Sequence, residues 1–235
     1  AEQMLLKLKE KDLTEPLTVL ANSANHLKSI INDTLDFTKI QSKTWSFNTV
    51  HFSPETDFEE VIRLQEKEAI KKGIEFIYTP ENDLPEALSC DPLRLKQMVL
   101  NLVSNAIKFT DSGSVELRVK SQKEDEHTTA LQFKVTDTGI GISEKNLQII
   151  FDEYVQAENP AGKKYSGTGL GLSIVKSLAV LQGGSVSVNS APGRGTVISV
   201  NIPYLPGNAE KIEYKDIKAP DIPGHFREHS VLIVD

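Results

Sequence analysis

Several residue types and patterns are scarce in this sequence, and each scarcity excludes a class of protein. The single cysteine, Cys90, cannot form a disulfide bond within the chain, so a reducing compartment fits the composition. No apolar run approaches the about 20 residues that cross a bilayer, and no signal peptide is visible. Basic residues are outnumbered, with 26 against 33 acidic residues and a net charge of −7. That balance argues against nucleic-acid binding, which needs a basic face.

The residues that are present are enough for a folded protein. With 235 residues, of which 39% are hydrophobic, the chain can bury a sizeable core in one or two domains. It begins without methionine and ends on the short strand-like run S-V-L-I-V-D, so we expect a piece of a longer protein.

Residues 91–110 form the stretch around which we expect the chain to be organised. Asp91 and Pro92 suit the cap and the first position of a helix, and most of the residues that follow are apolar. At about 100° per residue, four polar side chains fall in one narrow stripe: Arg94, Asn101, Asn105 and Lys108. A buried amide or ammonium group needs a partner, so the stripe meets either other protein groups or an oxygen-rich ligand.

The residues before this stretch predict two further helices and a seam. One helix is expected to end near Lys11, and a second to open at residues 14–16, with Pro16 tolerated only in its first turn. Apolar positions then alternate at spacings of four and three, which is typical of a coiled coil or bundle: Leu13, Leu17, Leu20, Ala24, Leu27 and Ile31. We interpret this seam as a dimerisation surface; the alternative is an amphipathic helix that lies on its own domain.

Strands and helices alternate through the rest of the chain. Alternating apolar residues predict strands at residues 74–78, 115–119, 131–135, 186–188 and 198–202, while residues 41–50 and 80–89 are expected to be connections. Helices are expected after Ser53-Pro54, from 144 to 151, and from the glycine-rich run near 170 to Gly183-Gly184. The residues expected to point inward from the first and third of these helices are Phe58, Val61, Ile62, Ala69 and Ile70, and Leu170, Ile174, Val175, Leu178 and Leu181.

Asp137 stands at the end of a predicted strand and is followed by T-G-I-G. A buried carboxylate can accept a hydrogen bond from an exocyclic amine such as that of adenine. The glycines at 139 and 141 would let the backbone approach a flat ring closely. Taken alone, D-T-G is also an ordinary turn.

A third feature is the run G-T-G-L-G-L at residues 167–172, which opens a helix. Glycines there expose successive amide groups, and the helix start adds partial positive charge. The run therefore predicts a binding site for a chain of phosphates. Lys163 and Lys164 precede the run in a loop expected at residues 152–166. The run is neither a dinucleotide fingerprint nor a P-loop, because it lacks G-x-G-x-x-G after a first strand and G-K-[ST].

Taken together, these three features resemble the catalytic, ATP-binding domain of sensor histidine kinases, within the superfamily of gyrase, heat-shock chaperone, kinase and mismatch-repair ATPases. L-N-L-V-S-N-A-I-K-F-T resembles the family's N box, D-T-G-I-G its G1 box, F-D-E-Y its F box and G-T-G-L-G-L its G2 box. I-N-D-T-L-D-F-T-K-I is similar to the end of the second helix of the dimerisation and phosphoacceptor domain. The resemblance covers residues 14–203.

The resemblance implies roles for particular residues. Asn105 would ligate Mg²⁺ with Asn101 beside it, Lys108 would contact phosphate, Phe109 would lie near the adenine and Asp137 would read its amine. Residues 152–171 would cover the ATP. The implied cofactor-binding set is Asn101, Asn105, Lys108, Phe109, Asp137, Gly139, Gly141, Ile142, Lys164, Tyr165, Ser166, Gly167, Thr168, Gly169, Leu170, Gly171, Leu172 and Thr196, with Asn105 as the metal ligand.

The resemblance also implies a fold and a domain plan. We expect an α/β (α+β) two-layer sandwich of the Bergerat type, with a mixed sheet and helices on one face, preceded by the remnant of a helical dimerisation hairpin. Residues 1–45 would end the dimerisation domain, 46–205 form the ATP-binding domain, 206–229 a linker, and 230–235 the first strand of a receiver domain in a hybrid kinase. We expect a homodimer with a response-regulator receiver as partner, a cytoplasmic kinase core, and membrane contact only through absent parts.

Asn101 bears on the reaction. Hydrolytic branches of the superfamily carry a glutamate at this place, whereas an asparagine has no carboxylate to activate water, so ATP should be held for transfer to another nucleophile. The family's acceptor pattern H-E-x-R-T-P is absent from all five histidines: His26, His51, His127, His225 and His229. We therefore expect a protein-histidine kinase fragment that does not label itself. The alternatives are an ATP hydrolase or clamp of the same superfamily, and a non-catalytic ATP-binding signalling module.

Overall fold

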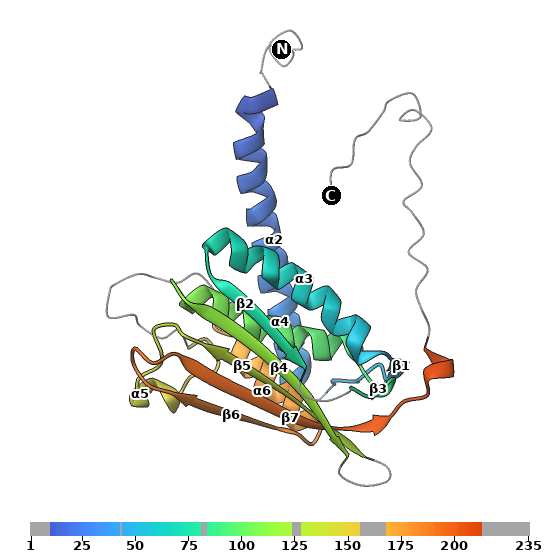
Figure 1. Ribbon diagram of the computed structural model, residues 1–235. Helices are drawn as coiled ribbons and strands as arrows, with labels where there is room; N and C mark the ends of the chain where they lie inside the picture. The colour runs from blue at the N-terminus through green and yellow to red at the C-terminus, as the bar shows by residue number, and fades with distance from the viewer. Residues whose placement is uncertain (1–9, 43, 81–83, 124–127, 156–167, 213–235) are drawn as a thin grey trace, which may run out of the picture.

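The computed structural model describes residues 10–42, 44–80, 84–123, 128–155 and 168–212. Figure 1 shows a long helix, α2, rising out of a body in which helices cover one face of a sheet. No helix within these described ranges is long and apolar enough to cross a membrane. The expected receiver strand at 230–235 and most of the expected linker lie outside them.

Helix α2 runs without interruption over Glu10–Gln41, which is 32 residues. The predicted helix start at residues 14–16 is therefore wrong, because Lys11 and Pro16 belong to the same helix. Proline removes one backbone hydrogen bond from a helix, and this loss is tolerated here within a much longer run of backbone hydrogen bonds. The first predicted helix, as far as it is described, is thus continuous with the second.

The sheet has seven strands, and its mixed character confirms the prediction. The strands are β1 (Val50–Phe52), β2 (Glu75–Pro80), β3 (Leu88–Cys90), β4 (Ser114–Lys123), β5 (Thr129–Asp137), β6 (Ser185–Ser190) and β7 (Thr196–Pro206). Their order is β1-β3-β7-β5-β4-β2, and β6 also pairs with β7. Among these described strands, only β2 and β4 pair in parallel. Strands β1 and β3 were not predicted: they begin in the last residues of the predicted connections, and with three residues each they are too short to show an alternating pattern.

Three helices cover the inner face of the sheet: α3 (Pro54–Lys72), α4 (Pro92–Phe109) and α6 (Gly171–Leu181). Helix α4 packs between α3 and α6 and contacts β5. Its cap is the predicted one, because the Asp91 carboxylate accepts a hydrogen bond from the backbone N–H of Arg94. The two remaining helical segments are short, α5 (Glu144–Leu147) and η1 (Ala209–Lys211), so the expected helix at 144–151 ends four residues early.

The core lies between the helices and the sheet. Its fully buried side chains include Phe58, Leu95, Met98, Leu102, Leu117, Leu131, Phe133, Leu170, Ile174 and Leu178. Two predictions of inward residues are wrong: Ile70 is 68% exposed and Leu181 is 49% exposed. Both occupy the last turn of their helix, and Ile70 stands about 100° round the helix from the fully buried Ala69.

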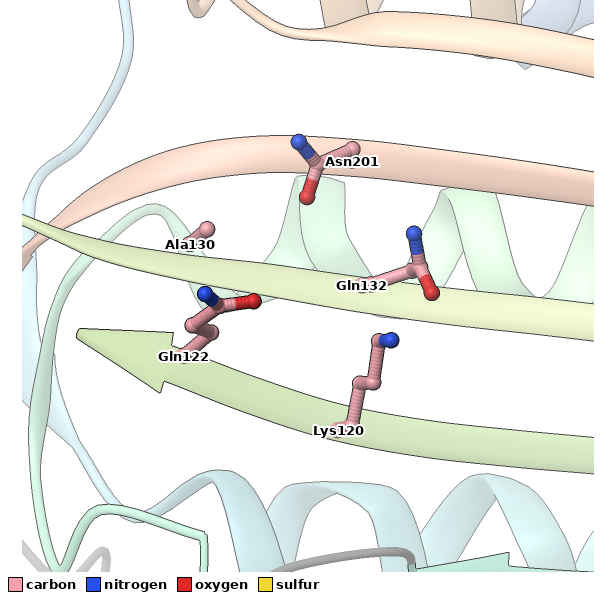
Figure 2. Close-up of a pocket in the computed structure, with 5 residues that line it drawn as sticks. All are labelled: Lys120, Gln122, Ala130, Gln132 and Asn201. Atoms are coloured by element: carbon pink, nitrogen blue, oxygen red, sulfur yellow. The ribbon is translucent and has the colours of Figure 1, made fainter. Parts of the chain in front are cut away.

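The outer face of the sheet is polar. A shallow pocket there is lined by side chains from β4, β5 and β7 (Figure 2): Lys120, Gln122, Ala130, Gln132 and Asn201. Gln132 lies between the buried Leu131 and Phe133, so it points away from the helices. This pocket is therefore on the opposite side of the sheet from α4 and its polar stripe.

Candidate functional site

Asp137 ends β5 at the centre of the predicted site. Its Oδ1 accepts hydrogen bonds from the backbone N–H of Gly139 (2.9 Å) and of Thr196 (3.2 Å). Its Oδ2 accepts none from the residues that the structure describes. The side chain is 9% exposed, and this burial raises the pKa of the carboxyl, while the two backbone hydrogen bonds lower it. Two backbone N–H groups thus fix one oxygen of the carboxylate.

The turn after Asp137 is packed against backbone on two sides. A Cβ at Gly139 would overlap the carbonyl oxygen of Phe109, the last residue of α4. Gly141 has a φ of 67°, and a Cβ there would overlap the carbonyl oxygen of Ala191. Both glycines are therefore required by close approach of the backbone, and they join the end of α4 to the β6–β7 turn.

Ser190 holds this turn from the far side. Its hydroxyl accepts from the backbone N–H of Ile142 (2.9 Å), donates to the carbonyl oxygen of Gly195 (2.7 Å) and lies 3.0 Å from Thr196 Oγ1. Gly139, Gly141, Ile142 and Thr196 were predicted for the site and lie together around Asp137. Ser190 was not predicted, because a serine at the end of a strand carries no signal in a single sequence.

The two asparagines of α4 meet the start of α6. The Asn101 Nδ2 donates to the carbonyl oxygen of Gly171 at 3.3 Å. A Cβ built on Gly171 would lie 3.7 Å from Asn101 Cγ and 3.8 Å from Asn105 Nδ2. The predicted N box and G2 box are therefore adjacent in space, although about 70 residues separate them in the sequence.

The last turn of α4 carries Lys108 and Phe109. The Lys108 Nζ lies 4.8 Å from the centroid of the Phe109 ring, and burial lowers the pKa of this lysine. Lys72 of α3 donates to the carbonyl oxygens of Ile107 and Lys108, each at 2.7 Å, and so caps the helix. Lys72 is a second residue that the sequence did not single out, although a lysine in a last helical turn is common.

The glycine-rich run is described from Thr168 onward, and Lys164, Tyr165, Ser166 and Gly167 lie outside the described residues. The Thr168 hydroxyl accepts from the backbone N–H of Leu170 at 3.1 Å. Gly169 has a φ of 73°, Leu170 is buried and Leu172 is partly buried against the core. Helix α6 begins at Gly171, so the helix start and its partial positive charge face the two asparagines.

Arg94 contacts helix α2, whereas Asn101 and Asn105 of the same polar stripe lie beside the start of α6. Its Nη1 contacts the Asp36 carboxylate of α2 at 2.8 Å, and its guanidinium lies 4.4 Å from the centroid of the Trp45 ring. The polar stripe therefore splits along α4. Arg94 in its first turn pairs with Asp36 of α2, and Asn101 and Asn105 meet the start of α6.

Protein ligands for a metal ion are few in the described part of the chain. It holds no group of three or more histidine, cysteine, aspartate and glutamate side chains that could bind a metal. Mg²⁺ usually takes one or two protein oxygens and completes its shell with water and phosphate. Asn105, whose side-chain amide lies beside the start of α6, carries one oxygen of the kind that this pattern needs.

Comparison with known proteins agrees with this geometry. Residues 90–206 match the profile of the family described as "Histidine kinase-, DNA gyrase B-, and HSP90-like ATPase", and this domain of the chain belongs to that family. The domain is homologous to the ATP-binding domains of sensor histidine kinases. The predicted family and fold are thus confirmed.

Curated relatives are sensor kinases. The chain is 35% identical to the sensor protein GacS of Pseudomonas syringae pv. syringae over 92% of this chain and 24% of that protein. It is 37% identical to the sensor histidine kinase RcsC of Escherichia coli (strain K12), over 85% of this chain and 21% of that protein. The chain therefore spans about a quarter or less of the length of these relatives.

Solved structures show the same fold. Full-length ShkA in complex with AMPPNP superposes with a TM-score of 0.70 at 31% identity, over 86% of this chain and 41% of that chain. The catalytic domain of the histidine kinase ThkA superposes with a TM-score of 0.51 at 26% identity, over 71% of this chain and 99% of that chain.

Proposed function

We propose that this chain carries the catalytic core of a two-component histidine kinase, which transfers the γ-phosphoryl group of ATP to a histidine on a dimerisation helix. The observation that supports this most is the meeting of three elements: the Asp137 turn, the asparagines of α4 and the glycine-rich start of α6. The phosphohistidine would then pass its phosphoryl group to an aspartate of a response regulator.

The adenine ring would lie against the turn after Asp137. Oδ2 of Asp137 would accept a hydrogen bond from the exocyclic amine, while Oδ1 stays held by the N–H groups of Gly139 and Thr196. Gly139 and Gly141 do not open space for the ring as expected, because carbonyl oxygens of Phe109 and Ala191 fill the places of their missing side chains; they fix the turn beside Asp137 instead. We call Asp137, Gly139, Gly141 and Thr196 the adenine side of the site.

The phosphates would lie between α4 and the start of α6. Backbone N–H groups of the glycine-rich run and the Lys108 ammonium would neutralise phosphate charge, and Asn105 would hold Mg²⁺ with Asn101 beside it. Bound Mg²⁺ supplies charge stabilisation for the transferring phosphoryl group. We call Asn101, Asn105, Lys108 and residues 168–172 the phosphate side.

Asn101 favours transfer over hydrolysis. Its Nδ2 donates to Gly171, so the side chain is oriented by the protein, and an amide has no basic oxygen that takes a proton from water at neutral pH. ATP bound beside Asn101 should therefore be hydrolysed slowly and remain available for transfer to another nucleophile. This argues against a hydrolytic clamp.

Further assignments rest on the same similarity. Apolar side chains on α2 stay exposed in the single chain, and a second copy of the helix would cover them in a homodimer: Val19, Leu20, Leu27, Ile31 and Leu35. Residues 1–45 would belong to the dimerisation domain and 46–205 to the ATP-binding domain. A receiver domain would follow the linker at 206–229, and the core would act in the cytoplasm, where its ATP is found.

The test measures binding and turnover separately on the full chain. We expect AMPPNP to bind in the presence of Mg²⁺ in isothermal titration calorimetry, and ATP turnover without an acceptor histidine to stay at background. Absence of AMPPNP binding would support a non-catalytic module. Turnover that is well above background and is lost in Asn105→Ala would show a hydrolase instead.

A further inference from the structure

Helix α2 contacts the candidate site along one stripe. Asp33, Phe37 and Gln41 are spaced four residues apart and therefore share one face of the helix. Each meets a residue beside the site: Asp33 Oδ2 accepts from the Thr168 hydroxyl at 3.2 Å, the Phe37 and Tyr154 ring centroids lie 6.0 Å apart, and the Gln41 Nε2 donates to Glu153 at 2.7 Å. The helix thus touches the chain on both sides of residues 156–167.

A buried ion pair holds α2 in this position. Asp36 is 8% exposed, and its carboxylate accepts hydrogen bonds from Arg94 and Gln97 of α4, each at 2.8 Å. Arg94 also stacks on Trp45, which follows α2 in the chain. Because a buried charge is costly without its partners, Asp36 stabilises one placement of the helix, and that placement sets where Asp33 lies.

Asp33 brings a negative charge to the phosphate side. It is partly buried and contacts Thr168, whose hydroxyl also accepts from the N–H of Leu170, one residue before α6 begins. A carboxylate so placed interacts with the same partial positive charge of the helix start that a phosphate would use. Burial raises the pKa of the Asp33 carboxyl, and so does the charge of Asp36, while the hydrogen bond from Thr168 lowers it and favours the ionised form.

We propose that Asp33 is an affinity-determining residue of the nucleotide site, whose charge opposes the triphosphate whenever α2 is docked on the domain. The inference rests on the proposed nucleotide site. By linkage, phosphate binding then weakens the contact between Asp33 and Thr168 to the same extent that this contact weakens phosphate binding. The position of the dimerisation helix would in this way set how tightly the domain holds ATP.

The experiment compares two ligands on the full chain. Asp33→Asn keeps the size of the side chain and its hydrogen bond to Thr168 but removes the charge. We expect it to tighten AMPPNP binding about threefold to tenfold and to leave adenosine binding unchanged, because adenosine has no phosphate. The tightening should shrink at high salt. Glu66→Gln, an exposed carboxylate change on α3, is the control for net charge and should alter neither affinity.

Other outcomes overturn the inference. Equal tightening for adenosine and AMPPNP would mean that Asp33 acts through the position of α2 and not through its charge. Unchanged or weaker AMPPNP binding would also contradict it. Asp33→Glu, which keeps the charge, should restore the wild-type ratio of the two affinities. If the wild-type chain binds neither ligand, the proposed nucleotide site itself fails, and this result is distinct from an unchanged affinity in Asp33→Asn.

Discussion

The adenine side and the phosphate side of the site differ in what holds them in place. On the adenine side, Asp137 is fixed by backbone N–H groups, and the Gly139 turn is wedged against the carbonyl oxygen of Phe109. On the phosphate side, side chains of α2 and α4 contact the start of α6 and the residues just before it: Asn101 donates to the carbonyl oxygen of Gly171, and Asp33 accepts from Thr168. The adenine side is therefore built into the sheet, whereas the phosphate side depends on how three helices are placed.

The largest effect is expected from adding one methyl group to the adenine side of the site. In Gly139→Ala the new Cβ meets the backbone of Phe109, which cannot move without displacing the end of α4. We expect the free energy of unfolding to fall by about 2–4 kcal/mol and AMPPNP binding to be lost. Urea denaturation and calorimetric titration measure the two effects.

Gly193→Ala is the matched control for that change. Gly193 lies in the neighbouring turn with a φ of 71°, and nothing lies within 4 Å of its added Cβ. Only the cost of the left-handed backbone remains, about 1 kcal/mol, and AMPPNP binding should survive. Similar losses in the two variants would show that the Gly139 turn is no more constrained than an ordinary surface turn.

A smaller effect is expected from Asp137→Asn, which changes the hydrogen-bonding groups of the side chain but not its shape. Asp137→Asn can keep the two hydrogen bonds to Oδ1 but turns the other oxygen into an amide nitrogen, which cannot accept from the adenine amine. We expect AMPPNP affinity to fall about 30-fold or more and the free energy of unfolding to change by less than about 1 kcal/mol. An affinity within about twofold of wild type would place the adenine elsewhere.

The sequence predicted the parts of this site that are local in the chain. The Asp91 cap, the Asp137 turn and the glycine-rich start of α6 each follow from neighbouring residues, and the resemblance then brought them together. The strands β1 and β3 were missed because three residues carry no period. The inward prediction failed at Ile70 and Leu181 because periodicity along one helix does not show which of its residues other elements cover.

Contacts between side chains that are far apart in the chain could not be predicted from the sequence. Arg94 pairs with Asp36 across 58 residues, and Thr168 with Asp33 across 135. No local pattern marks such pairs, since each member alone is an ordinary polar residue on a helix or in a turn. These contacts are the ones that place α2 on the domain, so the coupling between α2 and the phosphate side required the folded structure.

The central claim is that the site holds ATP for transfer to a histidine. The direct measurement incubates the full chain with γ-labelled ATP, Mg²⁺ and a separate acceptor helix that carries the H-E-x-R-T-P pattern. We predict label on the acceptor that is lost in acid and stable in base, as a phosphohistidine is, and none when the acceptor histidine is replaced by alanine. An unlabelled acceptor, with free phosphate released from ATP instead, would contradict the account.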